Sequence, residues 1–145
     1  MYNIEVESSR CHRVGESGVL VMSTSVPGDE VAHRIGGGDA SNLTLKPAEE
    51  RLEPPGFSVL MGGTPEQAAA DFRRVFGAGS TLGRLARVVG TAEIRAIQAI
   101  GFDVIAVPTN NFPNHGRVIH PGGVAGFTPE NLQKLATVFV NKGGL

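Results

Sequence analysis

The chain has 145 residues, of which 41% are hydrophobic and 19% charged, and its formal net charge is −1. This length suits one domain with a sizeable core, and the balanced charge gives no electrostatic reason to expect a polyanion bound over the whole surface. A single cysteine, Cys11, excludes a framework of intrachain disulfides and suits a reducing compartment. The sequence shows no apolar run of membrane-spanning length and no signal peptide, so we expect a cytoplasmic protein without membrane contacts, whose delivery into a target cell would need another route.

The first 55 residues are predicted to be rich in loops. Residues 2–7 alternate apolar and polar side chains, and residues 19–22 form a short apolar run, so each segment is a predicted strand. Residues 23–55 contain a run of three glycines and several prolines without sustained periodicity. They are expected to form a long irregular loop, with a hint of a short strand at Leu43 and Leu45, and such loops in compact domains are usually functional or mobile.

Residues 56–145 are predicted to form the compact core. An apolar strand over residues 57–61 is followed by Thr64-Pro65-Glu66-Gln67, which supplies an N-cap hydroxyl, a proline at the first helical position and a glutamine for a capping box. Two more short helices are expected, one from residue 80 or 81 to Gly90 and one from Thr91 to Gly101, because each has a hydroxyl start and a glycine stop.

The C-terminal third is predicted to contain two strands and a helix. Residues 102–107 and 116–120 are apolar runs separated by the turn-rich segment PTNNFPN, which allows antiparallel pairing. Thr128-Pro129 begins a helix, and its apolar residues are spaced i, i+3, i+4 and i+7: Leu132, Leu135, Ala136 and Phe139. We therefore predict one α+β domain over residues 1–145, with a mainly antiparallel sheet and short helices packed on one face.

The candidate catalytic residues are His115, Arg117 and His120, which lie within six residues of one another. Two imidazoles that titrate near neutral pH can act as general base and general acid. A guanidinium group between them can stabilise the charge on a phosphate in the transition state. This combination predicts metal-independent cleavage of RNA or a nucleotide. The residues expected to line the site as hydrogen-bonding groups are Thr109, Asn110, Asn111 and Asn114.

The same region resembles the small toxin domains found at the C-terminal ends of bacterial polymorphic and secretion-system effectors. The residues that carry this resemblance are Pro113-Asn114-His115, Arg117-Val118-Ile119-His120-Pro121 and Gly126-Phe127. Many such domains are nucleases with a histidine after a Pro-Asn turn. The resemblance therefore implies a bacterial toxin or effector with ribonuclease-type hydrolase activity, and a cognate inhibitor or immunity protein as its partner.

An alternative site is formed by Arg13 with Ser23, Thr24 and Ser25. His12-Arg13-Val14 and Met22-Ser23-Thr24-Ser25 are similar to the arginine strand and the Ser-Thr-Ser strand of the ADP-ribosyltransferase toxins. That resemblance implies NAD as a cofactor, although here the arginine and the Ser-Thr-Ser segment are only ten residues apart and no glutamate stands out as the third element. The leading hypothesis requires no cofactor.

Three further interpretations concern other chemistry. His115 and His120 with Asp103 are a weak candidate for a metal site, because the spacing is not that of a helical zinc pair and the site would lack cysteine ligands; we expect no metal. The segment 81–100, with Arg84, Arg87 and Arg95, has some features of a helix-turn-helix. The third interpretation involves no catalysis: the chain would be an interaction protein whose residues 23–55 contact a partner.

Overall fold

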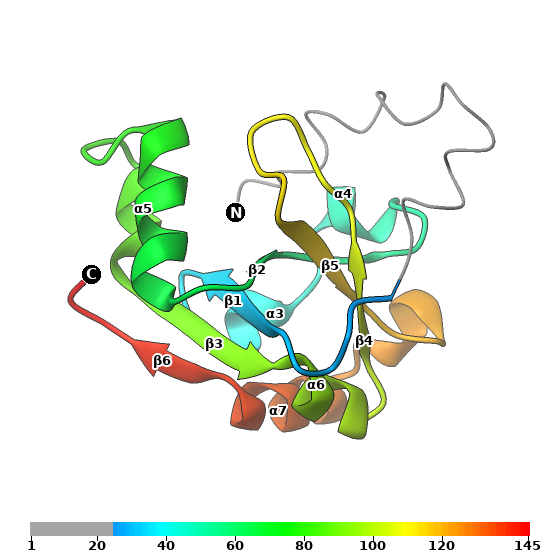
Figure 1. The fold of residues 1–145 in the computed structure, drawn as a ribbon. Coiled ribbons are helices and arrows are strands. Elements are labelled where there is room, and N and C mark those ends of the chain that lie inside the picture. The colour runs from blue at the N-terminus through cyan, green and yellow to red at the C-terminus, as the bar shows by residue number, and fades with distance from the viewer. Residues whose placement is uncertain (1–24) are drawn as a thin grey trace.

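The structure is a computed structural model that describes residues 25–145. Its centre is a six-stranded sheet in the order β4-β5-β2-β1-β3-β6, and every strand pairing among the described residues is antiparallel (Figure 1). The expected α+β class with a mainly antiparallel sheet is confirmed. The strands are β1 (Val31–Ile35), β2 (Gly56–Met61), β3 (Val89–Glu93), β4 (Asp103–Ala106), β5 (His115–Ile119) and β6 (Val140–Lys142).

The helices are divided between the two faces of the sheet rather than confined to one. On one side, α3 (Ala40–Leu43), α6 (Ile94–Ala99) and α7 (Pro129–Val138) bury their apolar residues against the sheet, and on the other side lies α5 (Pro65–Phe76) (Figure 1). The remaining helical segments are α4 (Pro47–Glu50) and the 3₁₀ turns η2 (Gly83–Arg87) and η3 (Gly123–Gly126).

The two faces are named here for α7 and α5. Because successive side chains of a strand point to opposite faces, the strand registers assign each sheet residue to one of them. The α7 face carries Ala32, Arg34, Phe57, Val59, Ala92, Val104 and Val118. The α5 face carries His33, Ile35, Ser58, Leu60, Val89, Thr91, His115 and Arg117.

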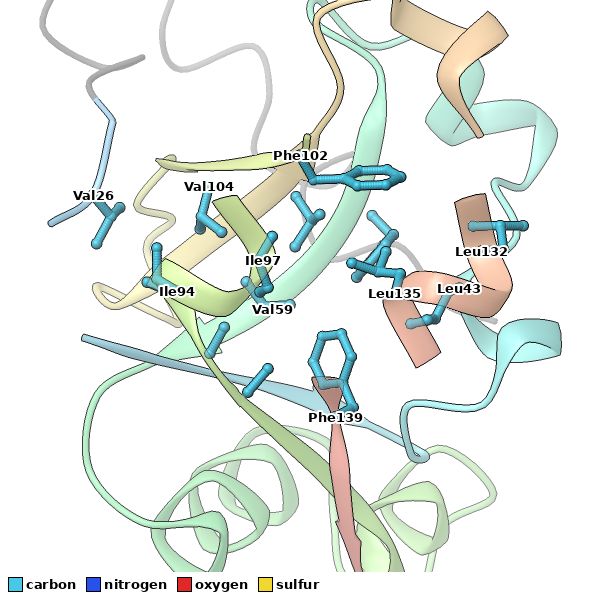
Figure 2. Packing of buried hydrophobic residues seen from close by; sticks show 14 of the residues in the cluster. Val26, Leu43, Val59, Ile94, Ile97, Phe102, Val104, Leu132, Leu135 and Phe139 are labelled. Carbon is cyan, nitrogen blue, oxygen red and sulfur yellow. The ribbon is translucent and has the colours of Figure 1, made fainter. Parts of the chain in front are cut away.

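The larger hydrophobic core lies on the α7 face. Ile94 and Ile97 of α6 and Leu132 and Leu135 of α7 meet the apolar side chains of the sheet there, as Figure 2 shows. Phe139, the residue after α7, packs against the backbone of Gly38 so closely that a Cβ at Gly38 would lie 2.2 Å from the Cβ of Phe139. This contact requires glycine and holds the end of α7 beside the loop that follows β1.

The α5 face is covered by an aromatic cluster. Phe72 of α5 is buried against Phe112 of the β4–β5 loop, with ring centroids 6.3 Å apart, and Phe76 lies 4.7 Å from Phe72. The helix begins with the expected capping box: the Gln67 N–H donates to the Thr64 hydroxyl at 3.1 Å, and the Thr64 N–H donates to the Gln67 side chain at 2.9 Å. These bonds satisfy backbone donors that a helix start would otherwise leave unpaired.

Several sequence predictions are confirmed. The strand at residues 57–61 is β2, the two C-terminal strands pair as the antiparallel β4–β5 hairpin, and the last helix begins after Thr128 as expected. Gly101 follows α6 with φ 100°, a conformation that favours glycine.

Other predictions differ from the structure. Residues 89–93, expected to end one helix and start another, form strand β3 instead; Ile94 and Ile97 are nevertheless buried, because α6 begins directly after the strand. Residues 31–35, expected within an irregular loop, form β1 near the centre of the sheet. The strand β6 was not predicted, and Leu43 and Leu45 are buried without forming a strand. The strands predicted at residues 2–7 and 19–22 lie outside the described residues.

Truncation of Leu135 is expected to destabilise the protein. Its side chain is fully buried, so Leu135→Ala should lower the free energy of unfolding by about 2–5 kcal/mol through lost burial and a residual cavity. The half-exposed Val124 offers a matched control, and Val124→Ala should stay within about 0.5 kcal/mol of the unmodified protein. Urea unfolding of both variants checks this, and equal effects would contradict the assigned core.

Candidate functional site

Polar side chains gather on the α5 face where it crosses the central strands. One row of directly opposed residues runs across five strands, through Val140, Thr91, His33, Leu60 and His115. The neighbouring row places Ser58 of β2 opposite Arg117 of β5. Opposed residues on antiparallel strands have Cβ atoms about 4.5–5.5 Å apart. The sheet thus brings two histidines, two hydroxyl groups and an arginine to one side.

His115 is held at both ring nitrogens. The Nδ1 atom lies 2.7 Å from the carbonyl oxygen of Val107, and the Nε2 atom lies 2.9 Å from the hydroxyl of Ser58. A carbonyl oxygen only accepts hydrogen bonds, so Nδ1 carries the proton and Nε2 accepts the proton of the Ser58 hydroxyl. Burial lowers the pKa of His115 to about 4 despite its bond to Val107, which acts in the opposite direction. The ring is therefore neutral at neutral pH.

Arg117 lies two residues further along β5, on the same face. Its Nη1 donates to the carbonyl oxygen of Pro54 at 2.6 Å, and the side chain is almost completely buried. Desolvation lowers the pKa of the guanidinium to about 10, so it keeps its positive charge at neutral pH. The register places the Cα of Arg117 opposite that of Ser58, while the guanidinium itself lies at the carbonyl oxygen of Pro54.

His33 forms a second arrangement of the same kind. Its Nδ1 lies 2.8 Å from the Thr91 hydroxyl, and its Nε2 lies 3.0 and 3.2 Å from the carbonyl oxygens of Gly62 and Gly63. The two carbonyls require a proton on Nε2, so Nδ1 accepts the proton of Thr91. Burial lowers the pKa of His33, while the carbonyls and the charge of Glu66 act to raise it.

Arg34 faces the other side of the sheet. Its guanidinium donates to the carbonyl oxygens of Asn42 and Ser58 at 2.7–3.0 Å and lies 4.8 Å above the ring of Phe57. Burial lowers the pKa of Arg34 to about 10, and the charge of the buried Glu49 acts against that shift. Arg34 therefore links α3, through the carbonyl oxygen of Asn42, to β2, through the carbonyl oxygen of Ser58.

The structure does not bring His115 and His120 together. His120 follows Ile119 and points to the opposite side, where its ring packs against Phe102 of the α7-face core, with centroids 4.8 Å apart. Its Nδ1 accepts a hydrogen bond from the Gly122 N–H at 2.9 Å. His115 and Arg117, by contrast, share the α5 face. The expected acid–base pairing of the two histidines is therefore corrected. Side chains alternate between the two faces along a strand, and His115 and His120 are five positions apart, so their rings lie on opposite faces of the sheet.

The four residues expected to line the site belong to the β4–β5 loop. Asn110 and Asn111 are exposed, and the Thr109 hydroxyl accepts a hydrogen bond from the Phe112 N–H at 3.1 Å, which stabilises the turn. Asn114 donates to the carbonyl oxygen of Met61 at 2.9 Å and lines a polar groove of about 370 Å³ at the start of α5. These contacts give Thr109 and Asn114 structural roles in the loop.

The alternative sites are only partly described. Arg13, Ser23 and Thr24 lie outside the described residues, whereas Ser25 is exposed and donates to the carboxylate of Asp103 at 2.8 Å. Within residues 25–145 no group of three metal-ligating side chains lies close enough together to hold a metal ion. The helix-turn-helix interpretation of residues 81–100 is wrong, because strand β3 occupies the middle of that segment.

Sequence reasoning missed His33, Ser58 and Thr91. Each lies in a strand of five or six residues, and a run such as Val-Ala-His-Arg-Ile has neither a clean alternation nor a continuous apolar character. The usable signal was the adjacent His33 and Arg34 flanked by apolar residues, since charged and polar side chains are rarely buried unless they have partners.

No family model, curated protein or solved structure matches this chain. Among the described residues, no helix is long and apolar enough to cross a membrane.

The buried His115 should make stability depend on pH. An unfolded imidazole binds a proton near pH 6.5, whereas His115 in the folded protein does so only near pH 4. Between these values the unfolded chain binds more protons, so stability should fall as the pH drops from 6.5 towards 4, by at most about 3 kcal/mol from this residue. Burial also lowers the pKa of His33, so this residue should likewise make the protein less stable as the pH falls.

Urea unfolding at pH 7 and pH 4.5 measures this dependence. In His115→Gln the difference between the two pH values should shrink, and His120→Gln is the matched variant on the other face. An unchanged difference in His115→Gln would show that the ring is not buried in its neutral form.

Proposed function

We propose that the chain is a small enzyme of the bacterial toxin or effector type that cleaves RNA or a nucleotide in the cytoplasm without a metal ion. In this proposal His115 is the general base, and Arg117 remains the cation that binds phosphate. Ser58, absent from the original set of site residues, takes the role of nucleophile, and His120 has none.

The observation that carries the proposal is the hydrogen bond from the Ser58 hydroxyl to Nε2 of His115. A hydroxyl within reach of a neutral imidazole, with the imidazole oriented by a third group, is the arrangement that activates nucleophiles in many unrelated enzymes. Here the third group is the Val107 carbonyl, which fixes the proton on Nδ1 and leaves the Nε2 lone pair directed at Ser58. Perturbed pKa values at neighbouring residues are also typical of functional sites.

Arg117 favours a phosphate over a neutral substrate. Arg117 lies in register with Ser58 across the β2–β5 pair, and a guanidinium forms strong charge-assisted hydrogen bonds with phosphate oxygens. Such a charge stabilises a phosphoryl group more effectively as negative charge accumulates in the transition state.

The reaction would proceed in two balanced steps. The Ser58 oxygen attacks phosphorus while its proton passes to Nε2 of His115, the bond from phosphorus to the leaving oxygen breaks, and that oxygen takes the proton from His115. The intermediate is a phosphodiester of Ser58 that keeps the second ester group of the substrate. A water molecule then attacks its phosphorus, again with His115 as base, which releases a phosphate monoester and restores the Ser58 hydroxyl. Because the side chain of Ser58 is only 5% exposed, substrate binding must displace a segment that covers it.

Substitution at Ser58 and His115 tests the proposal. Ser58→Ala and His115→Gln should each lower the rate of cleavage of a fluorescent RNA oligonucleotide, or of bis(p-nitrophenyl) phosphate, by about 10²–10⁴. His120→Gln should leave the rate unchanged, whereas the original histidine pair requires a loss. Excess EDTA should have no effect on any of these rates.

If the hydrogen bond between Ser58 and His115 had only a structural role, the two substitutions would lower stability instead of cleavage by the folded protein. Thermal midpoints of the three variants separate loss of fold from loss of chemistry, and mass spectrometry of a rapidly quenched reaction detects the phosphodiester adduct on Ser58, which with bis(p-nitrophenyl) phosphate is a p-nitrophenyl phosphoryl group. Cleavage that persists in a folded Ser58→Ala protein, or an unmodified protein that cleaves neither substrate, would reject the proposal.

A further inference from the structure

An apolar groove lies beside β3 and β6, at one end of the strand order. Its volume is about 570 Å³, which falls in the range of pockets that bind small molecules. Glu93 and Lys142 also line it, and Lys142 forms an ion pair with Glu66. The apolar lining residues are Val31, Pro65, Ala92, Ala96, Val138 and Val140.

Thr91 adds a hydroxyl-bearing residue to this mainly apolar lining. It belongs to β3, is partly exposed, and lies in register between Val140 of β6 and His33 of β1. The hydroxyl donates to Nδ1 of His33 at 2.8 Å, and His33 is fully buried behind it. The order from the groove inwards is therefore hydroxyl, imidazole and the carbonyl oxygens of Gly62 and Gly63.

The surroundings of His33 suit a base that gains a proton during a reaction. Its Nε2–H points at two carbonyl oxygens, and the carboxylate of Glu66 contributes further negative potential. These groups stabilise an imidazolium ion once it forms, in the way that the third member of a catalytic triad does. The Gly62-Gly63 turn that supplies the carbonyls has φ values of 79° and 69°, which favour glycine.

We infer that this groove is a second reactive site, in which Thr91 is a nucleophile activated by His33 and the ligand is an ester with an apolar acyl chain. The apolar lining favours a hydrocarbon chain. Among residues 25–145 no arginine lines the groove, in contrast to the Ser58 cluster, and the ammonium group of Lys142 is paired with Glu66, so a phosphodiester is the less suitable ligand. This inference does not depend on RNA cleavage at Ser58.

The reaction is an acyl transfer with water as co-reactant. The Thr91 oxygen bonds to the ester carbonyl carbon while its proton passes to Nδ1 of His33. The bond from that carbon to the alcohol oxygen breaks, and the alcohol leaves with the proton from His33. Water then hydrolyses the acyl-threonine, which releases the carboxylic acid and restores the Thr91 hydroxyl.

An alkyl fluorophosphonate and p-nitrophenyl hexanoate are the probes for this site. We expect one fluorophosphonate per chain, located on Thr91 by peptide mass spectrometry, and hydrolysis of the ester by the unmodified protein. Thr91→Val removes the hydroxyl with little change of shape and should abolish the label and lower hydrolysis by about 10²–10⁴, whereas Thr91→Ser should keep both.

Two further variants control for folding and for groove occupancy. Thr137→Val makes the same change at an exposed threonine of α7 and should keep both activities. Ala96→Phe fills part of the groove without touching the hydroxyl and should reduce labelling and hydrolysis. A label on any residue other than Thr91, no label at all, or hydrolysis that survives in Thr91→Val would overturn the inference.

Discussion

Four basic side chains lie buried at the central strands, and the hydrogen bonds that they require constrain how those strands and their loops are placed. His33, Arg34, His115 and Arg117 are each at most 6% exposed. Burial without partners would cost several kcal/mol for each group. Backbone carbonyl oxygens supply most of the described contacts, from Asn42, Pro54, Ser58, Gly62, Gly63 and Val107. The chain segments after β1, before β2, after β2 and after β4 are thereby tied to the sheet.

The two histidines follow one pattern with different consequences. Each imidazole accepts a hydroxyl proton at one nitrogen and donates to carbonyl oxygen at the other, which fixes its tautomer, while burial lowers its pKa. Thr91 borders an apolar groove, while Ser58 lies in register with Arg117 on the neighbouring strand. Similar hydrogen bonding therefore supports two different chemical hypotheses, and the surrounding side chains distinguish them.

Arg34 connects the two faces of the sheet. Its guanidinium lies on the α7 face over Phe57, yet it binds the backbone carbonyl of Ser58, whose side chain is on the α5 face. Packing of the larger core and the position of the Ser58 hydroxyl are consequently linked through one arginine. In the same way, His33 links β1 to the turn that starts α5, so the polar groups fix the relative positions of helices that share no apolar core.

The sequence by itself determined the elements whose signals are local. The capping box at Thr64, the spacing of Leu132 and Leu135, and the turn-rich segment between β4 and β5 predicted α5, α7 and the hairpin, because these signals act within one or two turns of chain. Of the predicted site, His115 and Arg117 share a face. Alternation along an extended strand by itself separates Arg117 from His120. Only the tertiary structure decided that His115 joins the face of Arg117, that residues 31–35 form a central strand, and that Ser58 and Thr91 bind the two imidazoles. The two hydroxyl–imidazole contacts join residues 57 or 58 positions apart in the chain, and no local pattern encodes which polar side chain will find a partner at that distance.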